Sequence, residues 1–163
     1  MANNTIFLDL GAIKGNSKHQ TFIDKISLDS YSHSAGRELT DDTANSQRTK
    51  GQPRFSDVTC YKSTDSSTTE LYEYCLKATP IPKVTLSVGT NTGTDGKWVA
   101  TIVYVMEDVL IGSVSTSGQD GYPQDTFVLN FSKITGTYTK QEDTGAAKGN
   151  TEFIYDKSTT APK

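Results

Sequence analysis

The chain has 163 residues and a formal net charge of −3, and 34% of its residues are hydrophobic. This length favours a single domain, which can bury about two-thirds of its unfolded surface without a disulfide or a metal. The weak negative charge excludes the basic surface that nucleic-acid binding requires, and no apolar run approaches the roughly 20 residues of a membrane span. We therefore expect no nucleic-acid partner and no membrane insertion.

The N-terminal segment "NTIFLDL" is expected to form the first strand. Apolar residues recur in it at every second position from Ile6 to Leu10, which is the period of a strand. The same terminus lacks the basic region and the apolar stretch of about 7–15 residues that mark a classical signal peptide. We therefore expect a protein that is made in the cytoplasm and is not exported through such a signal.

A second strand is expected in "FIDKISLDSYSHS", which ends in a row of alternating serines. Ser30, Ser32 and Ser34 would face one side of this strand, and Tyr31 and His33 the other. An ordinary solvated sheet explains such a row, and so does the wall of a polar channel or groove. The alternation therefore predicts a strand with one hydroxyl-bearing side and leaves its role open.

The stretch from residue 36 to residue 54 is polar and carries both signs of charge. Its one large apolar residue is Leu39, so it shows neither strand nor helix periodicity. Loops longer than about 12–15 residues are usually functional or disordered. We expect an extended loop here, followed by another strand in "RFSDVTCYK".

One helix is expected over about residues 66–78, in "SSTTELYEYCLKA". Ser67 and Glu70 have the spacing of a capping box, in which both side chains bond to free backbone N–H groups at the start of a helix. Apolar residues then recur at intervals of three and four, as they do on one face of a helix. The residues of that face are Leu71, Cys75 and Ala78, with Tyr72 and Leu76 beside them.

The rest of the chain again has strand character. Alternating β-branched and aromatic residues mark "KVTLSV", "WVATIVYVMEDVLIGSVS", "DTFVLNFSKITGTYTK" and, more weakly, "TEFIYD". Many strands and a single helix predict a mainly β fold, either a closed or nearly closed small β-barrel or a sandwich, with one flanking α-helix.

The residues that catalysis or metal binding would need are few and scattered. The only histidines are His19 and His33, no serine lies in a G-x-S-x-G motif, and no glycine-rich stretch has the spacing of a phosphate-binding loop. Cys60 and Cys75 lie outside any zinc-binding spacing, and in a reducing compartment we expect buried thiols. We therefore predict a protein that is not an enzyme and holds no cofactor.

Three blocks of the chain occur in a characteristic order and spacing. They are "IFLDLGAIKGNS", "DVTCYKSTDSSTTELYEYCLKA" and "MEDVLIGSVSTSGQDGYPQDTFVLNFSKITGTYTKQEDTGAAKG", and from the first to the last they span nearly the whole chain, from Thr5 to about Asp156. The third block is the most specific. Together the blocks resemble the haemolysin-coregulated protein (Hcp) family, the tube proteins of bacterial type VI secretion systems.

The resemblance implies one domain over residues 1–156, a small β-barrel of two antiparallel sheets with one flanking helix, and a flexible tail over residues 157–163. It also implies a hexameric ring, and rings stacked into a tube that a contracting sheath drives into a neighbouring cell. The expected partners are further copies of the chain, the sheath and spike of the machine, and small effector proteins in the channel. Such a protein starts in the bacterial cytoplasm and is secreted without a classical signal peptide.

The resemblance also assigns two sets of site residues. The channel-facing set is Ser30, Ser32 and Ser34. The ring-stacking set lies in the extended loop 36–54 and comprises Arg37, Glu38, Asp41, Asp42, Arg48, Lys50 and Arg54. Members of the family often have a pair of tryptophans where this chain has Tyr31 and His33.

Two other functions fit the residues. A phage-type tail tube protein has the same expected fold, and its gene neighbours would distinguish it. A monomeric β-barrel that binds a small ligand or glycan would need an apolar pocket rimmed by aromatic residues, for which eight tyrosines leave room. Six-fold rings in negative-stain microscopy would favour a tube over the monomeric module.

Overall fold

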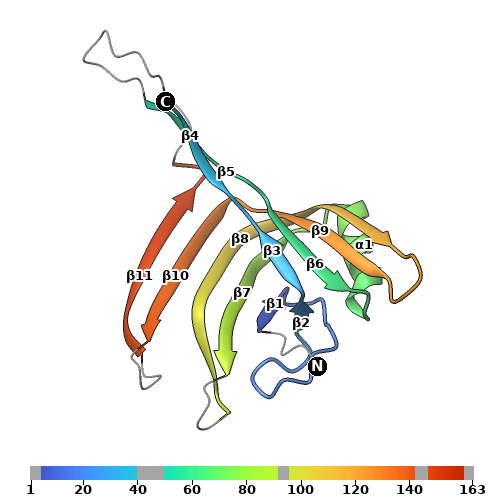
Figure 1. The fold of residues 1–163 in the computed structure, drawn as a ribbon. Coiled ribbons are helices and arrows are strands. Elements are labelled where there is room, and N and C mark those ends of the chain that lie inside the picture. Colours follow the sequence, from blue (N-terminus) through green and yellow to red (C-terminus); the bar gives the residue numbers. More distant parts are fainter. Residues whose placement is uncertain (1–4, 40–49, 92–95, 142–146, 160–163) are drawn as a thin grey trace.

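The computed structural model describes residues 5–39, 50–91, 96–141 and 147–159. Figure 1 shows its strands and single helix within these ranges. Their bounds are β1 (Ile6–Asp9), β2 (Ile26–Leu28), β3 (Ser30–Ser32), β4 (Ala35–Leu39), β5 (Lys50–Phe55), β6 (Val58–Ser63), α1 (Ser67–Lys77), β7 (Ile81–Asn91), β8 (Trp98–Ser117), β9 (Gln124–Asn130), β10 (Lys133–Gln141) and β11 (Ala147–Asp156). The predicted mainly β fold with one flanking helix is confirmed. No helix in the described ranges is long and apolar enough to cross a membrane.

Nine strands form one antiparallel sheet, and β4 and β5 form a separate two-stranded sheet. The path through the large sheet is β2-β1-β7-β8-β9-β6-β3, and β10 and β11 branch from β8. The long strand β8 pairs with β7 and β10 in its first half and with β9 in its second half. Asp108, just before β8 changes partners, has a positive φ of 52°, which marks a corner in the strand.

The backbone ladder of the large sheet does not close into a complete barrel. Its two end strands, β2 and β3, are consecutive in the chain, with only Asp29 between them. β2 pairs with β1, whereas β3 pairs with β6. The chain therefore passes from one end of the ladder to the other within a single residue, and the barrel is nearly closed at Asp29.

One row of residues in register runs across five strands, from the core to the edge strand β11. Leu8, Leu86 and Tyr104 are in register on β1, β7 and β8, and all three are buried. The row continues through Gly136 on β10 to Phe153 on β11. A Cβ atom at Gly136 would lie 2.1 Å from a ring carbon of Phe153, so glycine is needed here for the ring to lie against β10.

The segment 36–54, which we expected as an extended loop, is extended but forms strands at both ends. β4 and β5 pair antiparallel as far as Leu39 and Lys50, and they project from the body as a hairpin (Figure 1). Residues 40–49, between these strands, lie outside the described part of the chain. Every side chain of β4 is exposed, so this strand has no apolar alternation by which its sequence could reveal it.

The helix α1 lies within one residue of its predicted bounds but begins differently. The expected capping box of Ser67 and Glu70 is not formed. Instead, a carboxylate oxygen of Asp65 accepts the Ser67 N–H at 2.9 Å, and the Thr68 hydroxyl accepts the Asp65 N–H at 3.2 Å. Asp65 and Thr68 therefore provide bonds like those of a capping box that starts two residues earlier, except that the Asp65 carboxylate accepts from the Ser67 N–H rather than from that of Thr68.

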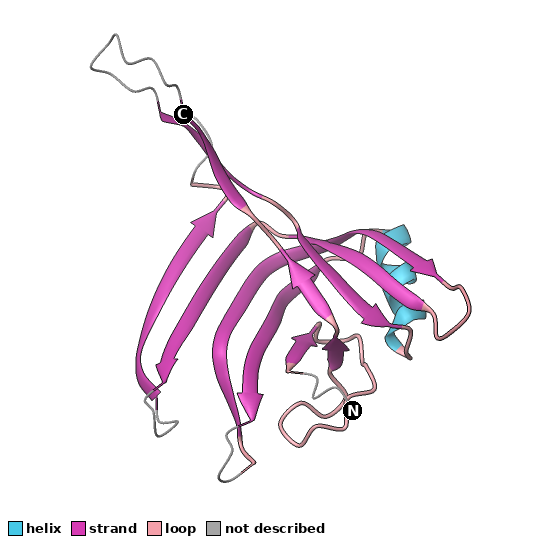
Figure 2. Ribbon diagram, viewed as in Figure 1, coloured by secondary structure: helices cyan, strands magenta, loops and turns pink. Residues whose placement is uncertain are grey.

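The predicted apolar face of α1 is only partly correct. Leu71 is fully buried, and Cys75 is half-buried against the core. Ala78, which ends the helix in the left-handed conformation with a φ of 49°, is exposed, and so is Leu76, which was expected beside this face. Tyr74 packs against the core beside Cys75. Figure 2 shows the helix on the side of the molecule away from β10 and β11.

A buried ion pair joins the start of α1 to the sheet. The side chains of Lys62 on β6 and Asp125 on β9 are fully buried, with Nζ 2.8 Å from Oδ2. Lys62 Nζ also lies 2.8 Å from Oδ1 of Asp65 and donates to the Thr68 hydroxyl at 3.1 Å. Burial alone would raise the pKa of Asp125, but hydrogen bonds from Lys62, Thr68 and Thr116 among others outweigh it and hold the pKa below its ordinary value.

The predicted C-terminal tail begins at residue 157, and its first residue is bonded to the body. The Lys157 N–H donates to the Ser132 carbonyl at 2.9 Å, and Lys157 Nζ lies 4.7 Å from the ring centroid of Phe131. Residues 160–163 lie outside the described ranges. The division into a domain over residues 1–156 and a flexible tail stays a prediction.

Candidate functional site: the assembly surfaces

The predicted serine row belongs to a larger face of the sheet, which we call the hydroxyl face. Cross-strand pairing aligns side chains of β3, β6, β9 and β8 in two rows. The first row is Ser30, Tyr61, Thr126 and Ser115, and the second is Ser32, Thr59, Val128 and Ser113. None of these side chains carries a charge, and seven of the eight carry a hydroxyl group.

The hydroxyl face is uncharged because charged residues of the same strands point the other way. On β6, Lys62 is fully buried, whereas the adjacent Tyr61 is 40% exposed. On β9, Asp125 is buried, whereas the adjacent Thr126 is half-exposed. The alternation of β-strands thus keeps both partners of the ion pair inside.

The three predicted channel residues do not all lie on the same part of the structure. Ser30 and Ser32 are exposed and lie in the two rows of the hydroxyl face. Ser34 is exposed too, but it follows β3, and its N–H donates to the Ser56 hydroxyl at 2.8 Å. Ser34 therefore belongs to the root of the hairpin. The role of all three in a channel stays a prediction.

The predicted stacking residues lie on the hairpin as far as the structure describes it. Arg37 and Glu38 on β4 and Arg54 on β5 have exposed side chains. Lys50 is the first residue of β5. The other three, Asp41, Asp42 and Arg48, lie outside the described residues.

At the root of the hairpin, His33 lies among three aromatic rings, and we call these four residues the root cluster. The ring centroids of Tyr31, Phe55 and Tyr104 lie 5.9, 5.3 and 4.7 Å from that of His33. Burial lowers the pKa of His33. Burial, and then a hydrogen bond with Tyr31, raise the pKa of Tyr104. Alternation placed Tyr31 and His33 on one side, but local sequence carries no signal for their partners on β5 and β8.

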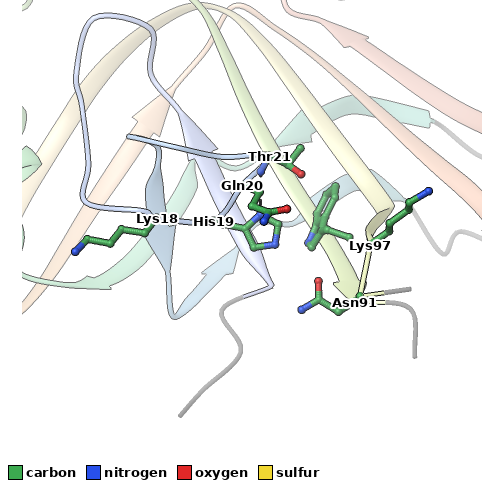
Figure 3. A pocket seen from close by; sticks show the side chains of 8 residues that line it. Lys18, His19, Gln20, Thr21, Asn91 and Lys97 are labelled. Carbon is green, nitrogen blue, oxygen red and sulfur yellow. Dashed lines mark hydrogen bonds between the residues drawn. The ribbon is translucent and has the colours of Figure 1, made fainter. Parts of the chain in front are cut away.

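A polar pocket of about 720 Å³ lies at the end of the body opposite the hairpin. It is lined by the loop before β2, the end of β7 and the start of β8. In Figure 3, Lys18 and Lys97 point away from each other, with His19 between them and Asn91 below. The pocket is therefore a polar depression between two outward-pointing lysines.

Trp98, the only tryptophan of the chain, lines this pocket. Its ring centroid lies 4.7 Å from that of Phe22 and 6.2 Å from that of Phe7. Its Nε1 is buried and has no hydrogen-bond partner in the part of the chain that the structure describes. Because no other tryptophan contributes, the intrinsic tryptophan fluorescence of the protein reports on this end of the molecule alone.

β11 is an open edge of the sheet within the described ranges. It pairs with β10 and with no other described strand. Ile154 on this strand is 58% exposed, and the strand contains no proline that would block pairing. Native proteins usually protect long edges, because free N–H and C=O groups pair with other chains. β11 is thus a candidate contact for another copy.

The described residues contain no group of three or more His, Cys, Asp or Glu side chains that could hold a metal ion. Cys60 and Cys75 are free thiols, and only Cys60 is fully buried as predicted. Burial raises the pKa of the Cys60 thiol far above its ordinary value. A thiol in that environment is a poor nucleophile.

Comparison with known proteins decides the family. A family model described as "Type VI secretion system effector, Hcp" matches residues 7–138. The chain belongs to the Hcp family. This confirms the resemblance found in the three sequence blocks, of which the third begins at Met106 inside the matched range and continues past its end to Gly149.

Known Hcp proteins resemble the chain over nearly its whole length. Hcp1 of Pseudomonas aeruginosa is 25% identical over 146 residues, which are 88% of each chain. A solved type six secretion system protein superposes with a TM-score of 0.88 at 22% identity, over 97% of this chain and 98% of its own. Hcp1 from Salmonella typhimurium gives a TM-score of 0.76 at 20% identity, over 95% of each chain. These matches show that the chain has the same overall fold as solved proteins of this kind.

Proposed function

We propose that this Hcp chain is a structural tube subunit without enzymatic activity, and that it forms hexameric rings that stack and carry small effectors. The uncharged hydroxyl face is the observation that carries the proposal, because it suits the wall of a water-filled channel. Ser30, Ser32 and Ser34 would line or border that channel. The match to the Hcp family favours this function over a phage-type tail tube or a monomeric ligand-binding module.

The proposed partners follow from the same function. The tube would contact the sheath and spike of the secretion machine on its outside and small effector proteins on its inside. It would be assembled in the bacterial cytoplasm and leave through the machine itself, which requires no classical signal peptide.

A closed ring of identical chains needs two different surfaces that fit each other, repeated around the ring. The open edge of β11 suits one of these surfaces, because its backbone groups can pair with a strand of the next copy. Phe153 and Ile154, which are 41% and 58% exposed, would be covered by the same contact.

Stacking of rings needs two different ends. The hairpin projects from one end of the body, and the end of β7 and the start of β8, which contribute to the pocket lined by Trp98, lie at the other (Figure 1). Head-to-tail stacking would bring the hairpins of one ring to the pocket ends of the next. The fluorescence of Trp98 should then differ between single rings and tubes.

Shortening the hairpin should abolish tubes and leave rings intact. Because Leu39 and Lys50 are directly paired, residues 40–49 can be replaced by Asn-Gly, a two-residue turn that fits such a pair. Sedimentation and negative-stain microscopy should show rings without tubes. The Trp98 emission should change with protein concentration in the parent and stay constant in the shortened variant.

A control for this experiment replaces residues 40–49 by a Gly/Ser segment of equal length. It keeps the reach of the segment and removes its charges, so it separates length from chemistry. Tubes that persist in the shortened variant would show that the hairpin does not mediate stacking.

The channel assignment is tested by the access of reagents to Ser32. In a Cys75→Ser background, we expect Ser32→Cys to react with a small maleimide in tubes but to be shielded from a maleimide on a long polyethylene glycol chain. Leu76→Cys is the control, because Leu76 is 84% exposed on α1 and should react with both reagents. Equal labelling of the two variants by the large reagent would place Ser32 outside the channel.

A further inference from the structure

His33 lies at the junction between the body and the hairpin. It follows β3 and precedes β4, and its imidazole stacks on Tyr31 and Phe55 at interplanar angles of 28° and 27°. The ring of Tyr104 on β8 meets it edge-on, at 75°. His33 is thus the central ring of the root cluster, in contact with rings from three strands.

The hairpin begins directly beside this cluster. Two hydrogen bonds join Ser34 and Ser56, one from the Ser34 N–H to the Ser56 hydroxyl and one from the Ser56 N–H to the Ser34 carbonyl, both 2.8 Å long. The next pair along the hairpin is Ala35 with Phe55. Because Phe55 stacks on His33, a displaced imidazole removes a contact from the first pair of the hairpin.

The groups that face the His33 ring do not compensate a proton on it. Among the described residues, the rings that contact it are the phenols of Tyr31 on β3 and Tyr104 on β8 and the phenyl ring of Phe55 on β5, and none of these residues has a carboxylate. A neutral imidazole stacks well in this half-buried site, whereas an imidazolium loses hydration there.

We propose that His33 is a proton-sensitive latch for the hairpin. Near neutral pH the uncharged ring holds the hairpin root in the root cluster, and in acid the imidazolium leaves the cluster for water and the root opens. This inference rests on the proposed stacking role of the hairpin, and it adds that acid weakens the tube.

The direction of the pH effect on opening follows from the linkage between protonation of His33 and opening of the root. Burial makes the pKa of His33 lower in the closed root than in the open root. The contact therefore stabilises fully above the open-root pKa, about 6.5, and is lost as the pH falls through the closed-root pKa. The total rise of the opening constant is tenfold for each unit by which closure lowers the pKa.

Two measurements on the full chain test the latch by comparing the protonation of His33 with the opening of the hairpin root. In a His19→Gln variant, where His33 is the only histidine, NMR titration gives the pKa of His33, and hydrogen exchange gives the opening constant at the Ser56 N–H. We expect this constant, corrected for intrinsic exchange, to rise between about pH 7.5 and about pH 5 by the factor that the measured pKa requires. The Asp29 N–H, bonded to the Tyr61 carbonyl in the body, is the internal reference and should not respond.

The control variant is His33→Phe, which keeps an aromatic ring and does not titrate. It should remove the acid-induced rise at Ser56. An unchanged Ser56 opening constant while His33 titrates would overturn the latch, and so would an equal rise in His33→Phe.

The stability of tubes provides a separate comparison of the parent and His33→Phe. Tubes formed by the parent at about pH 7.5 should dissociate at about pH 5, whereas those of His33→Phe should persist. Parent tubes that are equally stable at both pH values would overturn the effect on stacking. If neither protein forms tubes at about pH 7.5, the proposed function is contradicted, and the Ser56 exchange alone decides the latch.

Discussion

Replacing Lys62 by Met is expected to lower the free energy of unfolding by about 3–5 kcal/mol. The Lys62 ammonium lies 2.8 Å from carboxylate oxygens of both Asp65 and Asp125. Without it, the buried Asp125 carboxylate keeps only hydroxyl donors, such as Thr64 at 2.9 Å and Thr116 at 2.8 Å. An uncompensated buried charge is costly, and urea denaturation followed by circular dichroism should show a lower midpoint.

Two further variants separate the buried charge from the lost packing. Asp125→Asn in the Lys62→Met background should recover part of the stability, because it removes the uncompensated charge. Lys133→Met disrupts an ion pair with Glu107 whose side chains are 36% and 53% exposed, and it should cost less than about 1 kcal/mol. Equal losses in Lys62→Met and Lys133→Met would contradict the stabilising role of the buried pair.

Leu71→Ala should lower the free energy of unfolding by about 2–5 kcal/mol. Leu71 has no exposed surface, and it belongs to the core cluster through which α1 packs on the sheet. Truncation removes buried apolar surface and leaves a cavity between the helix and the sheet. Urea unfolding of the variant and the parent measures the difference.

Leu76→Ala is the matched control, because it makes the same chemical change on the same helix. Leu76 is 84% exposed, so its truncation should change the free energy of unfolding by no more than about 0.5 kcal/mol. If the two leucine variants lost equal stability, the assignment of the buried face of α1 would be wrong.

The strands with one buried side could be predicted from local sequence. Lys62 also has a local signal, because it follows Val58 and Cys60 at every second position on the buried side of β6. A lysine in that position predicts a buried partner of opposite charge. The identity of the partner is a different matter, since Asp125 lies 63 residues further along the chain and only the pairing of β6 with β9 brings it near.

The hairpin and most of the hydroxyl face could not be predicted from local sequence patterns. β4 is exposed on both sides, so its strand character comes from its pairing with β5 and leaves no apolar period. Ser30 and Ser32 were visible as a row, but Tyr61 and Thr59 join them only through the register of β3 with β6. Register between distant strands depends on the whole set of pairings, which no short window contains.

The predicted cap of α1 was wrong for a different reason, because two candidate capping boxes overlap within "DSSTTE". Both Ser67-Thr-Thr-Glu70 and Asp65-Ser-Ser-Thr68 have a suitable spacing. Lys62, fully buried between Asp125 and Asp65, selects the earlier one, because it holds the Asp65 carboxylate beside the start of the helix. A tertiary contact thus decides between two local motifs of similar quality.

The strand pairings also set an order of events during synthesis on the ribosome. β1 pairs with β7, and β6 pairs with β9, so the early strands emerge long before their partners. β8 then supplies partners to β7, β9 and β10. A chain that stalls before β9 exposes unpaired edges and is prone to aggregate. The nascent N-terminal half therefore carries unpaired strand edges until β9 has been synthesised.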